Sequence, residues 1–94
     1  MGLVDLRLWP HLIDFVTAAR SLGLRVWLFG SALTNSTPND LDVLVMYSDR
    51  HTVLELRAQR RWSDLDPPLD IIAMTTDEER HYRFIAGCSA VEIS

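Results

Sequence analysis

The chain has 94 residues, of which 48% are hydrophobic and 23% charged, with nine arginines, no lysine, thirteen acidic residues and a net charge of −4. These proportions are typical of a globular protein, and the length suits one core, so we expect residues 1–94 to form a single domain. No apolar run is long enough to span a bilayer. Without an overall basic field, the chain is not expected to have nucleic acid as its main partner.

The amino-terminal segment Met1–Pro10 carries the acidic residue Asp5 within its apolar pattern, and it lacks the basic start and small-residue cleavage site of a signal peptide. Cys88 has no second cysteine with which to form an internal bridge. Both features favour a cytoplasmic protein. We interpret Cys88 as a small buried apolar residue.

The first half of the chain predicts a helix followed by a strand. Apolar residues recur at steps of three and four along Pro10–Leu22, with proline in the first turn and Gly23 after the end, so this segment is predicted as an amphipathic helix. Arg25–Phe29 is predicted as a buried strand. A short helical turn over Ser31–Asn35 and a polar loop over Asn35–Asn39 follow.

The second half continues this alternation of strands and helices, which indicates an α/β fold. We predict, in order, a strand over Leu41–Tyr47, a helix from a cap at Ser48 or Asp49 to about Arg61, an irregular loop over Ser63–Pro68 and a strand over Leu69–Thr75.

The C-terminal segment predicts a last helix and a short edge strand. Thr76 and Glu79 have the spacing of a capping box, which predicts a helix over Asp77–Ala86 that Gly87 ends. The tail Ser89–Ile93 is predicted as an edge strand.

Three aspartates lie at the starts of two predicted strands. Side chains alternate along a strand, so Asp40 and Asp42 should project to one side, with their Cα atoms about 6.6 Å apart. Asp70 opens the next strand and joins them if the two strands are neighbours. Three carboxylates about 5 Å apart would repel by about 3 kcal/mol per pair at an effective dielectric constant of about 20. Bound divalent cations would remove this repulsion, which predicts a metal site.

A glycine and a serine follow the first predicted strand. Gly30 allows a sharp turn and a close approach of the backbone to a ligand, because it lacks a Cβ. Ser31 opens a helical turn, where unpaired amides and a hydroxyl suit the phosphates of a nucleotide. Either pair alone, Gly-Ser or Asp-x-Asp, is a weak signal. Their combination with a third aspartate on the next strand predicts phosphoryl chemistry.

The chain resembles the DNA polymerase beta-like nucleotidyltransferase superfamily in its minimal form, through the segments Leu28–Leu33, Pro38–Val45 and Leu69–Ile72. The resemblance implies a small mixed β-sheet flanked by helices. It also implies two Mg²⁺ ions held by Asp40 and Asp42, completed by Asp70, with Gly30 and Ser31 at the triphosphate.

By the same resemblance, the reaction is transfer of a nucleoside monophosphate, with ATP as the expected donor, to an acceptor hydroxyl. The loop Ala32–Thr37 lacks the cation that many relatives carry after the Gly-Ser pair, and the chain ends at Ser94 without the helical domain of larger relatives. Members of the minimal group often work beside a helical partner protein, including toxin-antitoxin pairs. The alternative is a non-catalytic binding module that neutralises or regulates such a partner. The sequence leaves the acceptor, the base preference and the oligomeric state open.

Two further groups of charged residues allow two readings each. Arg50, Arg57 and Arg61 lie at spacings of seven and four on a predicted helix, with Arg60 beside them, and could hold phosphates or RNA or form a solvated face. Asp64-Leu65-Asp66 repeats the Asp-x-Asp pattern, but in a loop before two prolines, where solvated turn carboxylates are usual.

Overall fold

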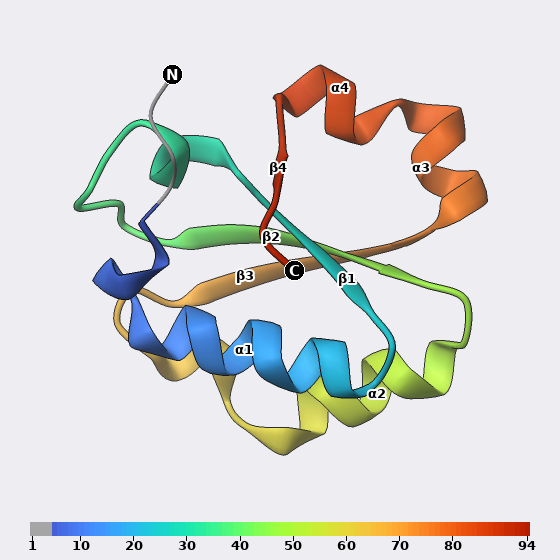
Figure 1. Cartoon of the computed structure of the whole chain (residues 1–94), viewed down its shortest axis with the longest axis horizontal. Helices are drawn as coiled ribbons and strands as arrows, with labels where there is room; N and C mark the ends of the chain where they lie inside the picture. The colour runs from blue at the N-terminus through green and yellow to red at the C-terminus, as the bar shows by residue number, and fades with distance from the viewer. Residues whose placement is uncertain (1–4) are drawn as a thin grey trace.

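A computed structural model describes residues 5–94, whose strands form one mixed sheet in the order β3-β2-β1-β4 (Figure 1). The α-helices are α1 (Pro10–Ser21), α2 (Arg50–Gln59), α3 (Thr76–Tyr82) and α4 (Phe84–Cys88). The strands are β1 (Arg25–Phe29), β2 (Leu41–Tyr47), β3 (Leu69–Thr75) and β4 (Val91–Glu92), and the 3-10 helices are η1 (Leu6–Leu8), η2 (Gly30–Leu33) and η3 (Trp62–Asp64). The predicted mixed sheet with flanking helices is confirmed.

The strands combine both pairing directions. β1 pairs antiparallel with β2 and with the short β4, whereas β2 and β3 are parallel and are joined through α2. A parallel pair needs such a crossover because the chain must return to the end of the sheet at which the first strand began. The first residues of β2 and β3 therefore lie side by side at one end of the strands, next to the last residue of β1 (Figure 1).

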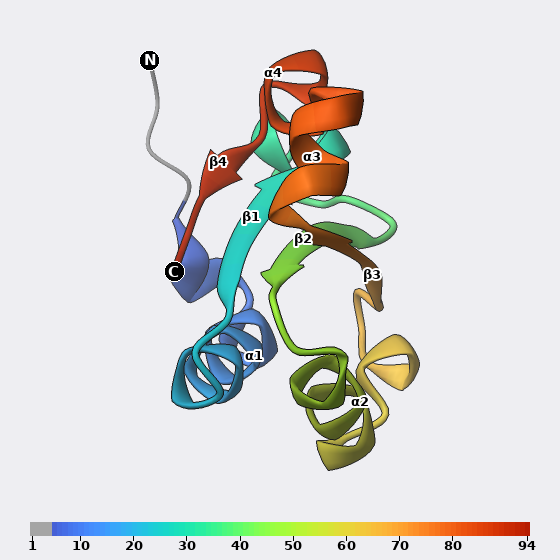
Figure 2. The ribbon, with the colours of Figure 1, turned by 90° about the vertical axis from the view of Figure 1, so that its right-hand side faces the viewer.

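Two helices cover one face of the sheet, and the other two lie on the opposite side (Figure 2). α1 and α2 supply the first layer, and Phe15 of α1 meets Trp62 edge to face with ring centroids 5.1 Å apart. Burial of this apolar surface is the main contribution to stability. The buried core comprises Trp9, Leu12, Phe15, Val16, Ala19, Leu24, Val26, Leu28, Ala32, Leu41, Val43, Val45, Leu56, Trp62 and Leu69.

The face under α3 and α4 is less completely covered. Leu44 and Trp27 are buried there, and Phe84 contacts Phe29 edge to face at 4.9 Å. Neither α3 nor α4 contains a buried residue, however, and Tyr82 remains 66% exposed. This second layer therefore contributes less apolar burial than the first.

The prediction of one unbroken helix over Asp77–Ala86 was wrong. The chain breaks at Arg83, which adopts a left-handed conformation with φ 51°, and resumes as α4. The Glu79 carboxylate accepts from the Ile85 amide at 3.0 Å, and the contact of Phe84 with Phe29 draws the second helix onto the sheet. Gly87 lies inside α4 rather than after a helix end.

Three other local expectations differ from the structure. Cys88, predicted to be buried, is exposed at the end of α4, a helix that contains no buried residue. The helix predicted to reach about Arg61 ends at Gln59. The region predicted as an irregular loop over Ser63–Pro68 begins within the 3-10 turn η3. The Trp62 ring of η3 lies in the core, where its Nε1 donates to the Leu56 carbonyl.

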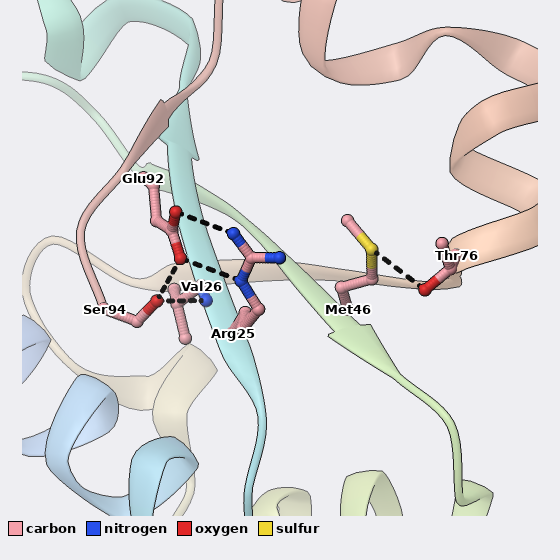
Figure 3. A network of polar contacts seen from close by, with 6 residues as sticks. All are labelled: Arg25, Val26, Met46, Thr76, Glu92 and Ser94. Carbon is pink, nitrogen blue, oxygen red and sulfur yellow. Dashed lines mark hydrogen bonds and ion pairs between the residues drawn. The ribbon is translucent and has the colours of Figure 1, made fainter.

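The C-terminal residues are tied to β1 by side chains as well as by backbone pairing (Figure 3). The Arg25 guanidinium donates to both carboxylate oxygens of Glu92, at 3.0 and 2.9 Å. The Val26 amide donates to the Ser94 hydroxyl at 3.1 Å, and that hydroxyl donates to Glu92 at 3.0 Å. These contacts extend the cover of the β1 edge beyond the two residues of β4. Among residues 5–94, no helix has the length and hydropathy that a membrane crossing requires.

The capping box of α3 lies one residue earlier than predicted, which gives a matched test. The Thr75 hydroxyl accepts from the Glu78 amide at 3.1 Å, and the Glu78 carboxylate accepts from the Thr75 amide at 2.9 Å. The Thr76 hydroxyl instead donates to the Met46 sulfur at 3.5 Å (Figure 3). Thr75→Ala should lower the free energy of unfolding by about 1 kcal/mol, and Thr76→Ala by clearly less. Urea unfolding of both variants measures the difference, and the reverse order would contradict this placement of the cap.

Candidate functional site

The three aspartates singled out in the sequence lie together where β2 and β3 begin. Asp42 and Asp70 are direct neighbours in the parallel register of these strands, so their side chains project from the same face. Asp40 immediately precedes Leu41, the first residue of β2. One carboxylate oxygen from each of the three lies within 4.8 Å of the others. The sheet therefore brings together the acidic cluster that we predicted.

Two contacts from loop backbone set the position of Asp70. The Leu41 amide donates to the Pro68 carbonyl at 2.8 Å, which extends the pairing of β2 and β3 back to their starts. The His11 Nε2 lies 2.8 Å from the Pro67 carbonyl and ties the same loop to α1. Leu69 is then buried in the core and Asp70 is exposed on the other side. The pairing register and the alternation of the strand fix which way Asp70 projects.

Gly30 lies directly against the Asp42 carboxylate. β1 pairs its last residue, Phe29, with Asp42, so the chain leaves the strand beside that side chain. Gly30 has φ +78°, and a Cβ at this position would collide with the Asp42 Oδ2 atom and stand 3.1 Å from its Cγ. The position therefore favours glycine for its left-handed backbone and for the space that the carboxylate occupies. The close approach in the structure is made to a protein carboxylate, and the approach to a ligand stays a prediction.

The cluster holds its negative charges without a cationic partner. None of the ion pairs found in residues 5–94 includes Asp40, Asp42 or Asp70. Partial burial raises the pKa of the Asp42 carboxyl above its ordinary value, and the charges of Asp40 and then Asp70 raise it further, as does a hydrogen bond with Asp70. The ionised form of Asp42 is therefore unfavourable in the protein as it stands.

The donor set fits a hard divalent cation. Carboxylate oxygens are the ligands that Mg²⁺ prefers, and three of them lie close enough to be shared by one ion or an adjacent pair. The missing Cβ of Gly30 leaves the Asp42 carboxylate room at its side. A bound cation would also offset the repulsion within the cluster.

The second part of the predicted site, the Gly-Ser step, lies beside the acidic cluster. Ser31 is exposed in η2, next to Gly30, and its carbonyl accepts from the Thr34 and Asn35 amides. Ala32 is buried in the core and anchors this turn. Ser31 therefore follows the glycine that lies against Asp42, on a short segment anchored by Ala32.

The other Asp-x-Asp pattern is not part of the cluster. Asp64 lies 3.5 Å from Arg61 in an exposed ion pair, and Asp66 is an exposed loop residue. Two features of the site region were not predicted, namely the contact of Gly30 with Asp42 and an open groove between Asp70 and the arginines that follow α2. The spacing of the arginines was visible in the sequence, but their position relative to β3 depends on the crossover.

Comparisons with protein-family models, with curated protein sequences and with solved structures gave no match.

Proposed function

We propose that the protein is a Mg²⁺-dependent nucleotidyltransferase of the DNA polymerase beta-like type, which transfers AMP from ATP to an acceptor hydroxyl. The observation that carries this proposal is the convergence of Asp40, Asp42 and Asp70, within 4.8 Å, beside Gly30 and Ser31. This arrangement combines cation ligands with a turn that suits phosphate groups. Neither part alone would indicate the reaction.

Asp40 and Asp42 would hold the metal, and Asp70 would complete its ligands on the acceptor side. When bound, Mg²⁺ supplies charge neutralisation at the phosphates and at the attacking and leaving oxygens. Ser31 would contact the part of the triphosphate that leaves as pyrophosphate. Because Asp70 is the exposed member of the trio, it is also the residue that an acceptor can reach.

The transfer itself is an in-line displacement at phosphorus. The acceptor oxygen forms a bond to the α-phosphorus, the bond from that phosphorus to the oxygen bridging toward the β-phosphorus breaks, and pyrophosphate leaves with the electron pair. The proton of the acceptor hydroxyl passes to Asp70 or to water. In this scheme Asp70 orients the acceptor as well as the metal.

The proposal is tested with α-labelled ATP and Mg²⁺, with and without a helical partner protein. The wild type should transfer label to an acceptor, and Asp42→Ala should reduce transfer at least about 100-fold, because loss of several kcal/mol of transition-state stabilisation corresponds to that factor. Asp66→Ala removes an exposed aspartate outside the cluster and should transfer normally. Equal transfer by wild type and Asp42→Ala would overturn the proposal, and pyrophosphate release without labelled product would indicate hydrolysis.

A second candidate function is a non-catalytic module that binds a helical partner. The layer formed by α3 and α4 favours it, because neither helix contains a buried residue and the Tyr82 side chain of α3 is 66% exposed. Such a surface suits apolar contact with another protein. In the labelling experiment, this function predicts no transfer by either protein, and equal binding of the partner by wild type and Asp42→Ala.

A further inference from the structure

An open groove of about 480 Å³ runs from Asp70 along the outer side of β3 to the end of α2. Arg57, Arg60 and Arg61 line it, and Asp70 is its only acidic lining residue, so cations outnumber anions there although the whole chain has a net charge of −4. Figure 2 shows α2 and the following turn beside the start of β3, which is the edge strand of the sheet. The groove and the acidic cluster therefore share Asp70.

A second concave region shares Arg57 with this groove and continues the line of arginines. It is lined by Arg50 together with apolar groups of Leu54 and Ala73. Arg50 and Arg57 are seven residues apart on α2, which places them about 10 Å apart along the helix axis. The positive charge is therefore repeated along a line that ends near Asp70.

The contacts that these arginines make within the protein are weak enough for a ligand to replace them. Arg60 and Arg61 form exposed ion pairs with Asp14 and Asp64, at 3.2 and 3.5 Å, and such pairs contribute only about 0–1 kcal/mol. Arg57 donates to the Ile71 carbonyl at 3.3 Å, a long hydrogen bond to a neutral group. A ligand with stronger acceptors, such as phosphate oxygens, can therefore recruit these guanidinium groups.

We propose that the arginine groove binds the phosphates of a single-stranded RNA acceptor whose 3′-terminal hydroxyl lies at Asp70. This inference rests on the proposed transfer reaction for the role of the hydroxyl. A nucleic acid strand carries one phosphate per nucleotide along a continuous backbone, which matches charges repeated along a line. In an extended acidic peptide, successive side chains point to opposite sides, so only every second carboxylate faces one row of arginines.

The overall charge of −4 makes nucleic acid an unexpected partner for the whole chain, but net charge does not describe how charges are distributed. The groove gathers Arg57, Arg60 and Arg61 beside the start of β3, the edge strand that carries Asp70. A strand bound there would place its last phosphate among the arginines, and its terminal ribose would extend toward Asp70. The acceptor strand is then held mainly by arginines that are not ligands of the metal.

The test measures binding without ATP or Mg²⁺, by fluorescence anisotropy with a 12-nucleotide single-stranded RNA labelled at its 5′ end. The double variant Arg57→Gln/Arg61→Gln should bind at least 10-fold more weakly than wild type. Its slope of log affinity against log salt should be smaller by about 1.4, since each phosphate contact to a single strand contributes about 0.7. The control Arg20→Gln/Arg80→Gln removes equal charge from two exposed positions outside the groove and should bind as wild type does. Melting temperatures of both double variants check that they are folded.

Three results would overturn the groove proposal. They are absence of RNA binding by wild type at 50 mM salt, equal weakening by both double variants, and binding of a polyglutamate peptide of equal charge as tightly as the RNA, which would identify an acidic protein partner. A labelling arm then offers RNA ending in a 3′-hydroxyl or in a 3′-phosphate, and only the former should accept label from α-labelled ATP. Because binding is measured without ATP, RNA binding with no transfer would refute the acceptor role of the RNA and leave its binding in the groove supported, whereas the transfer reaction is judged by the comparison of wild type with Asp42→Ala.

Discussion

Asp42→Asn should stabilise the metal-free protein at neutral pH and remove its response to Mg²⁺. Unit charges 4.8 Å apart, the separation limit within the cluster, repel by about 1–3 kcal/mol between fully aqueous and partly shielded surroundings. Neutralising the central carboxylate should therefore raise the free energy of unfolding by about 1–3 kcal/mol in the presence of a chelator. In wild type, Mg²⁺ at 100 times its dissociation constant should add about 2.7 kcal/mol. Urea unfolding with and without Mg²⁺ measures both effects.

The pH dependence of this difference has a definite sign. Because the pKa of Asp42 lies above its ordinary value of 3.8, the native protein retains a proton on this group at pH values where the unfolded chain has lost it. The contribution of Asp42 therefore lowers the free energy of unfolding as pH rises from below 3.8 through the raised pKa, and the full penalty is present at neutral pH. Asn does not titrate, so the advantage of Asp42→Asn over wild type should grow across that interval and then stay constant.

Asp66→Asn is the matched control, because it removes the same charge from an exposed position outside the cluster. It should leave both the metal-free stability and the Mg²⁺ response close to those of wild type. The interpretation fails if Asp42→Asn destabilises the metal-free protein, or if Mg²⁺ stabilises this variant as much as wild type. The stability of Asp42→Asn therefore separates a functional cation site from an acidic surface without a ligand.

The sequence predicted β1, β2 and β3 at their observed boundaries, because each is a short apolar run bounded by turn-forming residues. It also predicted that Asp70 would join Asp42 if their strands were neighbours, and the parallel pairing of β2 with β3 meets that condition. The prediction of the carboxylate cluster thus rested on side-chain alternation within one strand and on the pairing of strands that follow one another in the chain.

Features that depend on contacts between distant segments could not be predicted in the same way. The break at Arg83 reflects the contact of Phe84 with Phe29 on β1, which overrides the helical pattern of the local sequence. The groove beside Asp70 exists because the crossover returns the arginines of α2 to the edge of β3. The spacing of those arginines indicated one helix side, but not what that side faces.

Gly30→Ala should be the most destabilising of the glycine-to-alanine substitutions in the described part of the chain. A left-handed backbone costs a residue with a Cβ about 1–2 kcal/mol, and overpacking adds about 1–3 kcal/mol. We therefore expect a loss of about 2–5 kcal/mol, which corresponds to a fall in melting temperature of at least 8 °C for a domain of about this size. Affinity for Mg²⁺, measured by isothermal titration calorimetry, should fall as well, because the added methyl group must displace the Asp42 carboxylate.

Two other glycines separate the backbone strain from the collision. Gly23 has φ +75° with no atom within 4 Å of a Cβ, so Gly23→Ala should show the strain alone, about 1–2 kcal/mol. Gly87 lies in α4 with open space around it, and Gly87→Ala should be neutral or stabilising by up to about 1 kcal/mol. The order of destabilisation is therefore Gly30, then Gly23, then Gly87.

A double-mutant cycle attributes the excess cost at Gly30 to the Asp42 carboxylate. In an Asp42→Ala background, the carboxylate that the new methyl group would meet is gone, so Gly30→Ala should cost about as much as Gly23→Ala does in wild type. The coupling energy between the two positions should then be about 1–3 kcal/mol. An unchanged cost of Gly30→Ala in that background would mean that the glycine serves the turn alone. A reduced cost would mean that this position is shaped around the carboxylate at the centre of the proposed metal site.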